Sequence, residues 1–296
     1  MASVSPTRPK ESTSPMDHSS TTFKGDAMQD LLSDEFASSL LSLAAANAER
    51  YANGKPFPHI YFDDFLPAEA AEAALRDFPE PRQAKWSEFD TPQEKKLAFD
   101  VVERLPLGVR NVLYFMNSRP MVEFLEILTG INGVIPDPHY LGGGLHQIKP
   151  GGKLAVHADF NHHKRLNLER RINVLIYLNK DWKEEYGGHF ELWNKDMTAA
   201  EQKLLPVFNR CAIFSTTSTS YHGHPNPLSC PPDRTRKSVA TYYYSNGRPE
   251  EELRDAHTTL FVNRPGEVMH EPSVVKKAIR AFCPPILVEV YKKIRS

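Results

Sequence analysis

The feature that most constrains the fold is a series of short β-like segments between Leu141 and Ser245, separated by clusters of glycine. Seven of the 15 glycines lie in three clusters within this stretch, at 142–144, 151–152 and 187–188. Glycine suits tight turns between antiparallel strands because it adopts positive φ at no steric cost. The segments with strand character are 145–149, 153–158, 171–178, 188–193, 211–216, 219–223 and 237–245. Many short strands joined by regular turns predict a sandwich or a jelly-roll barrel.

The flanks of this β core have the pattern of helices. Apolar residues recur at helical spacing over 28–52, and Pro67 is suited to open a helix that runs through Leu75. A strand is expected at 58–65, between these two helices. Further helices are expected at 98–118 and 119–130, with a break at Pro120 and an end at Gly130, and at 274–282 and 285–294.

These elements predict an α+β fold, with a jelly-roll core at about 141–246 and N-terminal and C-terminal helices packed on it. A single domain is expected over 28–296. Residues 1–27 are rich in Ser, Thr and Pro and lack large aliphatic side chains, so they cannot offset the entropy of ordering. We therefore expect a disordered tail there.

The composition excludes several classes of protein. The 296 residues carry a formal net charge of −1, which provides no general attraction to nucleic acid or to an anionic membrane. Three widely spaced cysteines do not form a disulfide framework or a cysteine-based zinc site. No apolar run reaches the length of a membrane span, and no secretory signal is evident. We expect a cytoplasmic protein without nucleic-acid or membrane partners, and the oligomeric state stays open.

Histidine is where the chemistry is expected. His157 and Asp159 end an expected strand, and residues two apart on a strand face the same side. This pair alone is a weak signal, but His222 follows another expected strand. Two histidines and one carboxylate form a facial triad that leaves positions open on non-haem Fe(II). His224 is an alternative to His222 as the distal ligand, and is otherwise expected to be structural.

An anion contact is suggested at the start of the last strand, where Arg236, Lys237 and Ser238 follow one another. An arginine there is able to hold a co-substrate carboxylate through two hydrogen bonds. Lys237 would point to the opposite face, so only one of the two can serve. Tyr177 ends another strand and offers a hydroxyl to the same carboxylate. The basic run at 164–171 is interpreted as a solvated loop.

Several of these segments together resemble the Fe(II)/2-oxoglutarate-dependent dioxygenases, and most of all their prolyl 4-hydroxylase-like branch. The segments are HADFN at 157–161, YLNKDW at 177–182, the glycines at 187–188, FNRCAIFSTTSTSYHGHP at 208–225 and RKSVATYYYS at 236–245. A weaker likeness lies in PFPHIYFDDFLP at 56–67.

The resemblance implies a double-stranded β-helix in which His157, Asp159 and His222 hold Fe(II). It implies that Arg236 binds the distal carboxylate of 2-oxoglutarate, with Tyr177 and Ser238 beside it. The family places its distal ligand at the start of the SYHG segment, which favours His222 over His224. Members of this branch often carry a tyrosine at the position of Ile148, and His146 or Gln147 would have to take its place here.

The reaction implied by the resemblance consumes O2 and 2-oxoglutarate, yields succinate and CO2, and hydroxylates a C–H bond, with ascorbate as a helper in vitro. The intact Asp159 favours hydroxylation over halogenation. The substrate is expected to be a peptidyl proline or a small metabolite such as an amino acid or a sugar. The alternatives are a zinc-dependent hydrolase on the same ligands and a non-catalytic, cupin-like binding module.

Overall fold

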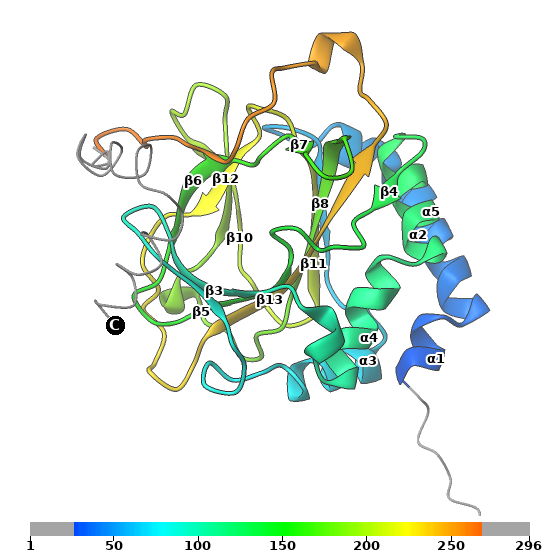
Figure 1. Ribbon diagram of the computed structural model, residues 1–296, viewed down its shortest axis with the longest axis horizontal. Coiled ribbons are helices and arrows are strands. Elements are labelled where there is room, and N and C mark those ends of the chain that lie inside the picture. Colours follow the sequence, from blue (N-terminus) through cyan, green and yellow to red (C-terminus); the bar gives the residue numbers. More distant parts are fainter. Residues whose placement is uncertain (1–26, 268–296) are drawn as a thin grey trace, which may run out of the picture.

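The computed structural model describes residues 27–267 (Figure 1). The expected tail, apart from Ala27, and the two expected C-terminal helices lie outside the described residues. Two antiparallel sheets face each other, and the helices pack on the outer side of the larger sheet. This arrangement is the predicted mixture of helices and a jelly-roll core. Within the described range, no helix has both the length and the apolar character needed to cross a membrane.

The larger sheet has the strand order β1-β11-β8-β13-β5-β3-β2, with β4 also paired to β13 and β7 to β8. Its strands are β1 (His59–Phe62), β2 (Ser87–Asp90), β3 (Lys95–Phe99), β4 (Ile135–Pro136), β5 (Gly144–Ile148), β7 (His162–His163), β8 (Leu168–Tyr177), β11 (Arg210–Ser215) and β13 (Arg236–Ser245). The smaller sheet has the order β10-β9-β12-β6-β14. Its strands are β6 (Leu154–Ala158), β9 (Phe190–Trp193), β10 (Ala200–Leu204), β12 (Tyr221–His224) and β14 (Leu260–Phe261).

The α-helices have local start and stop signals in the sequence. They are α1 (Ala27–Leu31), α2 (Asp34–Ala52), α3 (Ala68–Arg76), α4 (Leu107–Met116) and α5 (Arg119–Thr129). The Ser33 hydroxyl accepts a hydrogen bond of 3.1 Å from the backbone N–H of Phe36, which caps α2. Gly130, at φ 69°, ends α5 in the left-handed conformation that glycine adopts most easily.

The structure differs from the sequence prediction in the region before the core. The helix expected at 98–118 begins only at Leu107, because Lys95–Phe99 forms β3 and pairs with both β2 and β5. The helix expected at 28–52 is divided at Ser33, where its cap starts a second helix. The strands β2 and β4 in this region were not expected, and neither were β7, β10 and β14 further along the chain.

The central strand β8 separates the helical core from the space between the sheets. Ile172, Val174 and Ile176 are fully buried in the cluster that contains the helix side chains. Leu175 and Tyr177 have the other orientation and pack with Phe190, Leu192 and Phe214. This alternation follows the two-residue period of a strand. The inward-facing side chains of β8 and of its neighbours therefore line the interior of the jelly roll, where the candidate site lies.

Candidate metal and co-substrate site

The structure brings the three predicted metal ligands together. His157 lies on β6, Asp159 directly follows that strand, and His222 lies opposite His157 on β12. His157 Nε2 is 3.6 Å from Asp159 Oδ1, and His222 Nε2 is 3.3 Å from Asp159 Oδ2. Their potential ligand atoms all lie within 4.8 Å of one another, and no second group of this kind occurs among residues 27–267.

Backbone carbonyls fix the orientation of both imidazoles. His157 Nδ1 lies 2.8 Å from the carbonyl oxygen of Ala155, and His222 Nδ1 lies 2.9 Å from that of Ser220. A carbonyl only accepts hydrogen bonds, so each Nδ1 carries the proton and each Nε2 directs a lone pair at the centre of the group. Burial and then the neighbouring His222 lower the pKa of His157, which favours the neutral, metal-binding form. This donor set fits Fe(II).

The carboxylate of Asp159 is held by two side chains from β8. Its Oδ2 accepts hydrogen bonds from Arg170 Nη2 at 3.0 Å and from Asn173 Nδ2 at 2.7 Å. Burial by itself raises the pKa of Asp159, but Arg170, followed by the two imidazoles, outweighs it and holds the pKa well below its usual range. Asp159 is therefore an ionised carboxylate with a fixed orientation.

Arg170 corrects the interpretation of the basic run at 164–171 as a solvated loop. It lies on β8 and is 1% exposed. Its guanidinium carbon lies 3.5 Å from the centre of the Tyr242 ring and 4.4 Å from that of Phe160. An arginine enclosed by aromatic faces gains cation–π attraction in addition to its ion pair. The sequence pattern does not reveal this role, because counting by two from Ile172 places Arg170 on the side that faces the helices.

The predicted co-substrate contacts also meet in the interior. Buried Arg236 donates from Nε to the Gly188 carbonyl at 2.8 Å and from Nη2 to the Tyr177 hydroxyl at 3.4 Å. Ser238 lies directly opposite Tyr177 in the register of β13 and β8. A Cβ on Gly188 would lie 3.0 Å from Arg236 Cδ, so glycine makes room for the arginine. Among the described residues no carboxylate forms an ion pair with Arg236, and burial lowers its pKa.

The register of β13 with β5 distinguishes the remaining candidates. Ile148 lies opposite Arg236 and His146 lies opposite Ser238, so both share the interior face. Gln147 lies opposite Lys237 on the other face and donates a hydrogen bond to Thr235. Lys237 Nζ lies 3.7 Å from Glu80. Of the two proposed replacements for the family tyrosine, only His146 has the required orientation.

His224 is buried two residues beyond His222 but is not part of the three-residue group. Neither of its ring nitrogens has a hydrogen-bond partner among the described residues. Burial, then Arg236 and Lys96, hold its pKa well below the usual range. The imidazole of His224 therefore lacks the hydrogen bond that a buried structural histidine is expected to make.

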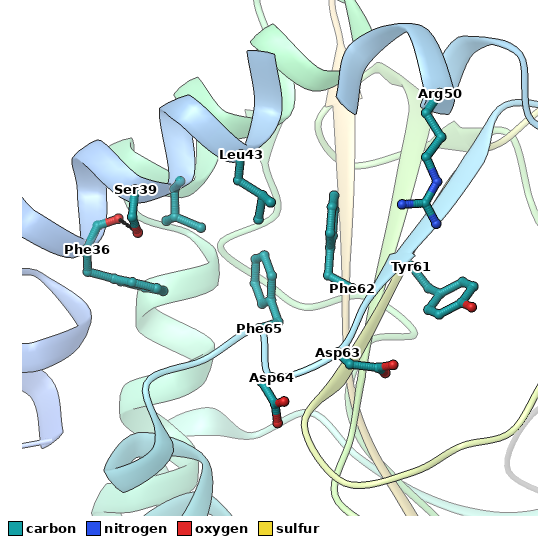
Figure 2. Close-up of a pocket in the computed structure, with 10 residues that line it drawn as sticks. Phe36, Ser39, Leu43, Arg50, Tyr61, Phe62, Asp63, Asp64 and Phe65 are labelled. Atoms are coloured by element: carbon teal, nitrogen blue, oxygen red, sulfur yellow. Dashed lines mark hydrogen bonds between the residues drawn. The ribbon is translucent and has the colours of Figure 1, made fainter. Parts of the chain in front are cut away.

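A surface pocket of about 520 Å³ lies apart from these residues, between α2 and the end of β1 (Figure 2). Phe36, Leu43 and Phe65 line one part of it, and Arg50 and Asp63 lie at another. It contains none of the metal or co-substrate candidates. The volume of a pocket is thus no guide to the chemistry of this protein.

Comparison with known proteins agrees with this geometry. Residues 143–244 match the sequence model of the 2OG-Fe(II) oxygenase superfamily. The structure is similar to a Trichoplax adhaerens prolyl hydroxylase, solved in complex with a hypoxia inducible factor oxygen degradation domain peptide fragment, with a TM-score of 0.54 and 16% identity over 73% of this chain and 96% of that one. It is also similar to a Pseudomonas putida prolyl-4-hydroxylase, with a TM-score of 0.50 and 16% identity over 70% of this chain and 100% of that one.

At 16% identity the two similar structures support the fold alone, whereas the sequence match supports the chemistry. The matched range contains β5 through β13 and thus every predicted metal and co-substrate contact. The chain thus contains a 2OG-Fe(II) oxygenase domain at 143–244, the mark of an oxygenase that uses Fe(II) and 2-oxoglutarate, and its fold is the jelly-roll fold of the two prolyl hydroxylases.

Proposed function

We propose that this enzyme hydroxylates an unactivated C–H bond, with Fe(II) bound by His157, Asp159 and His222. The observation that carries the proposal is the convergence of two imidazole Nε2 atoms on one ionised carboxylate in the interior that also holds Arg236. Three protein ligands on one side of a metal leave the opposite positions open for other ligands.

Arg236 is the proposed anchor of 2-oxoglutarate. Its Nε is engaged by Gly188, while Nη2 makes only a long contact with Tyr177, so its outer nitrogens are able to turn to a carboxylate. The Tyr177 hydroxyl and Ser238 stand beside it as further hydrogen-bonding groups. When bound, Fe(II) and 2-oxoglutarate supply the oxidising power with O2, and 2-oxoglutarate leaves as succinate and CO2.

The chain also protects the proposed metal site from water. The strand β14 pairs with the end of β6, placing Leu260 opposite Ala158 and Phe261 opposite His157. The Phe261 ring centre lies 5.6 Å from that of His157. The side chain of Asn161 binds the backbone of the segment that leads to β14, through the carbonyl of Asp255 and the N–H of His257. This apolar cover restricts solvent access on that side of the ligands.

For the substrate, we propose a peptidyl proline as the first candidate and a small metabolite, such as an amino acid or a sugar, as the second. The support for peptidyl proline is the fold shared with two prolyl hydroxylases. Fold alone does not determine a substrate, so proline-containing peptides should be assayed beside free amino acids and sugars. Addition of a single oxygen atom, detected by mass spectrometry, identifies the product.

The test is succinate formation from 2-oxoglutarate with Fe(II) and ascorbate. We expect His157→Ala and Asp159→Ala to abolish it, and Arg236→Ala to raise the KM for 2-oxoglutarate because the anion loses its anchor. Lys237→Ala is the matched control, since that cation points to the opposite face of β13. Turnover that survives His157→Ala would refute the proposed metal site. Hydrolysis that depends on Zn(II) but not on Arg236 would favour a hydrolase instead.

A further inference from the structure

His224 presents an unexplained buried polar group in the interior of the jelly roll. The residue is 3% exposed, and both ring nitrogens lack partners in the described part of the chain. An imidazole carries at least one N–H in either protonation state, so one buried donor is always left unsatisfied. Native structures rarely tolerate this without an ion, a water molecule or a ligand to complete the hydrogen bond.

The position of His224 indicates which ligand completes the missing hydrogen bond. Being two residues from His222 on β12, it faces the same side of the strand. The register of β12 with β6 shifts between these histidines, so that Leu154 lies opposite His224. In the antiparallel pairing of β12 with β9, Gly223 lies opposite Glu191, so the same register places His224 beside Phe190. Phe190 belongs to the buried cluster that contains Tyr177, whose hydroxyl contacts Arg236. His224 therefore borders the space between the three-residue metal group and Arg236.

Lys96 and Arg236 differ in whether a carboxylate of the protein already forms an ion pair with them. Lys96 Nζ lies 3.2 Å from the carboxylate of Glu94. Arg236 has no carboxylate partner among the described residues, and neither ring nitrogen of His224 has a hydrogen-bond partner there. An anionic co-substrate bound between the metal group and Arg236 would supply the acceptor that His224 lacks.

We infer that His224 donates a hydrogen bond to the distal carboxylate of 2-oxoglutarate and is a second anchor beside Arg236. The inference rests on the proposed function, because it takes Arg236 as the first anchor. The two histidines of the HGH segment at 222–224 then have different roles, since His222 binds the metal and His224 binds the co-substrate. A carboxylate with two oxygens accepts both contacts at once.

The experiment measures binding without turnover, by equilibrium dialysis of radiolabelled 2-oxoglutarate against the full chain loaded with Mn(II) in place of Fe(II). The variants are His224→Ala, His224→Leu, His224→Asn and Arg236→Ala. The control is His59→Ala on β1, because the His59 ring forms a hydrogen bond with the backbone carbonyl of Phe57. For every variant, Mn(II) binding is measured through the spectroscopic signal of the free ion, and the fold is checked by circular dichroism.

We expect His224→Leu to weaken 2-oxoglutarate binding about tenfold or more, as the loss of a hydrogen bond to a charged group does. His224→Asn should restore part of the affinity because its amide also donates. Mn(II) binding should stay unchanged in all three variants.

Two outcomes would overturn the inference alone, and a third would overturn the proposed co-substrate site together with it. If His224→Leu and His224→Ala bind 2-oxoglutarate like wild type while Arg236→Ala does not, His224 is not an anchor and the proposed function stands. If His224→Ala loses Mn(II), His224 is a metal ligand instead. If Arg236→Ala also binds normally, the proposed co-substrate site itself is wrong.

Discussion

At the scale of single residues, the orientation of Asp159 depends on β8. Arg170 and Asn173 both donate to Oδ2, and Arg170 Nε also donates to Asn173 Oδ1 at 2.9 Å, so the three side chains form one network. Because this network engages Oδ2, Oδ1 is the oxygen left for a metal. Partners of this kind, which contact a metal ligand and not the metal, orient the ligand and tune its basicity.

We predict that Arg170→Met weakens Mn(II) or Fe(II) binding by about 10- to 100-fold, the usual effect of losing such a partner. The substitution leaves a buried carboxylate without its cation, and its pKa should rise toward the range of a buried acid. Metal titration of the purified variant gives the affinity. Arg171→Met is the control, since Arg171 bonds Ser245 through Nη1 and ion-pairs with Glu252. Equal metal affinities in the two variants would show that Arg170 has no such role.

At the scale of elements, the predictable part of the fold is the part in which strand periodicity is regular. The strands that carry His157 and Arg236 were predicted within one residue because glycine turns and alternating side chains mark them. The strand β2 is exposed at all four positions, so no alternation distinguishes it from a loop. Its existence depends on pairing with β3, which a local pattern does not contain.

Arg170 shows a second limit of periodicity. Counting back by two from Ile172 would place Arg170 on the face that packs against the helices. In the structure Tyr243 lies opposite Ile172 and Tyr244 lies opposite Arg170, so Arg171 is an extra residue in β8. A bulge of this kind reverses the orientation of everything beyond it and turns Arg170 into the interior. The grouping of His157, Asp159 and His222 was predictable from spacing and resemblance, whereas the network that supports Asp159 was not.

Gly223 links the geometry of β12 to the metal site. A Cβ at this position would lie 2.8 Å from the Leu154 carbonyl oxygen and 2.9 Å from that of Ala155, both on the backbone of β6. We predict that Gly223→Ala pushes β12 away from β6, which separates His222 from His157. The variant should lose both stability and metal affinity, as measured by thermal unfolding and Mn(II) titration.

The control for this prediction is Gly247→Ala. Gly247 has a φ of 86° and nothing within 4 Å of an added Cβ, so the substitution strains the backbone without displacing a neighbour. It should reduce stability by about 1 kcal/mol and leave metal affinity as it is. If Gly223→Ala behaves in the same way, the close approach of β6 and β12 does not determine the metal geometry.

At the scale of the whole molecule, buried tyrosines join the helical layer to the larger sheet. The Tyr51 hydroxyl on α2 lies 2.7 Å from the hydroxyl of Ser215 on β11. The Tyr243 hydroxyl on β13 donates to the carbonyl of Met116 on α4 at 2.5 Å. Both tyrosines are 1% exposed or less. Burial strongly raises the pKa of each, because the phenolate would lose its hydration inside the core.

These shifts predict that the protein loses stability in alkaline solution. In the unfolded chain a tyrosine ionises near pH 10, whereas Tyr51 and Tyr243 stay protonated in the folded state. Above about pH 10 the folded state therefore binds more protons than the unfolded state, and the free energy of unfolding falls by about 1.4 kcal/mol per pH unit for each group. Their contribution is complete below pH 10 and is lost as the pH rises toward the folded-state pKa.

Urea unfolding between pH 8 and pH 11 measures this dependence. We expect the Tyr51→Phe, Tyr243→Phe double variant to be less stable than wild type at pH 8, by about 1 kcal/mol for each lost hydrogen bond. Its stability should nevertheless fall less steeply above pH 10, because two of the groups that ionise on unfolding are gone. Tyr114→Phe is the control, since Tyr114 is 43% exposed on α4, and it should keep the wild-type slope. A double variant with the same slope as wild type would mean that the junction between helices and sheet opens before these tyrosines ionise.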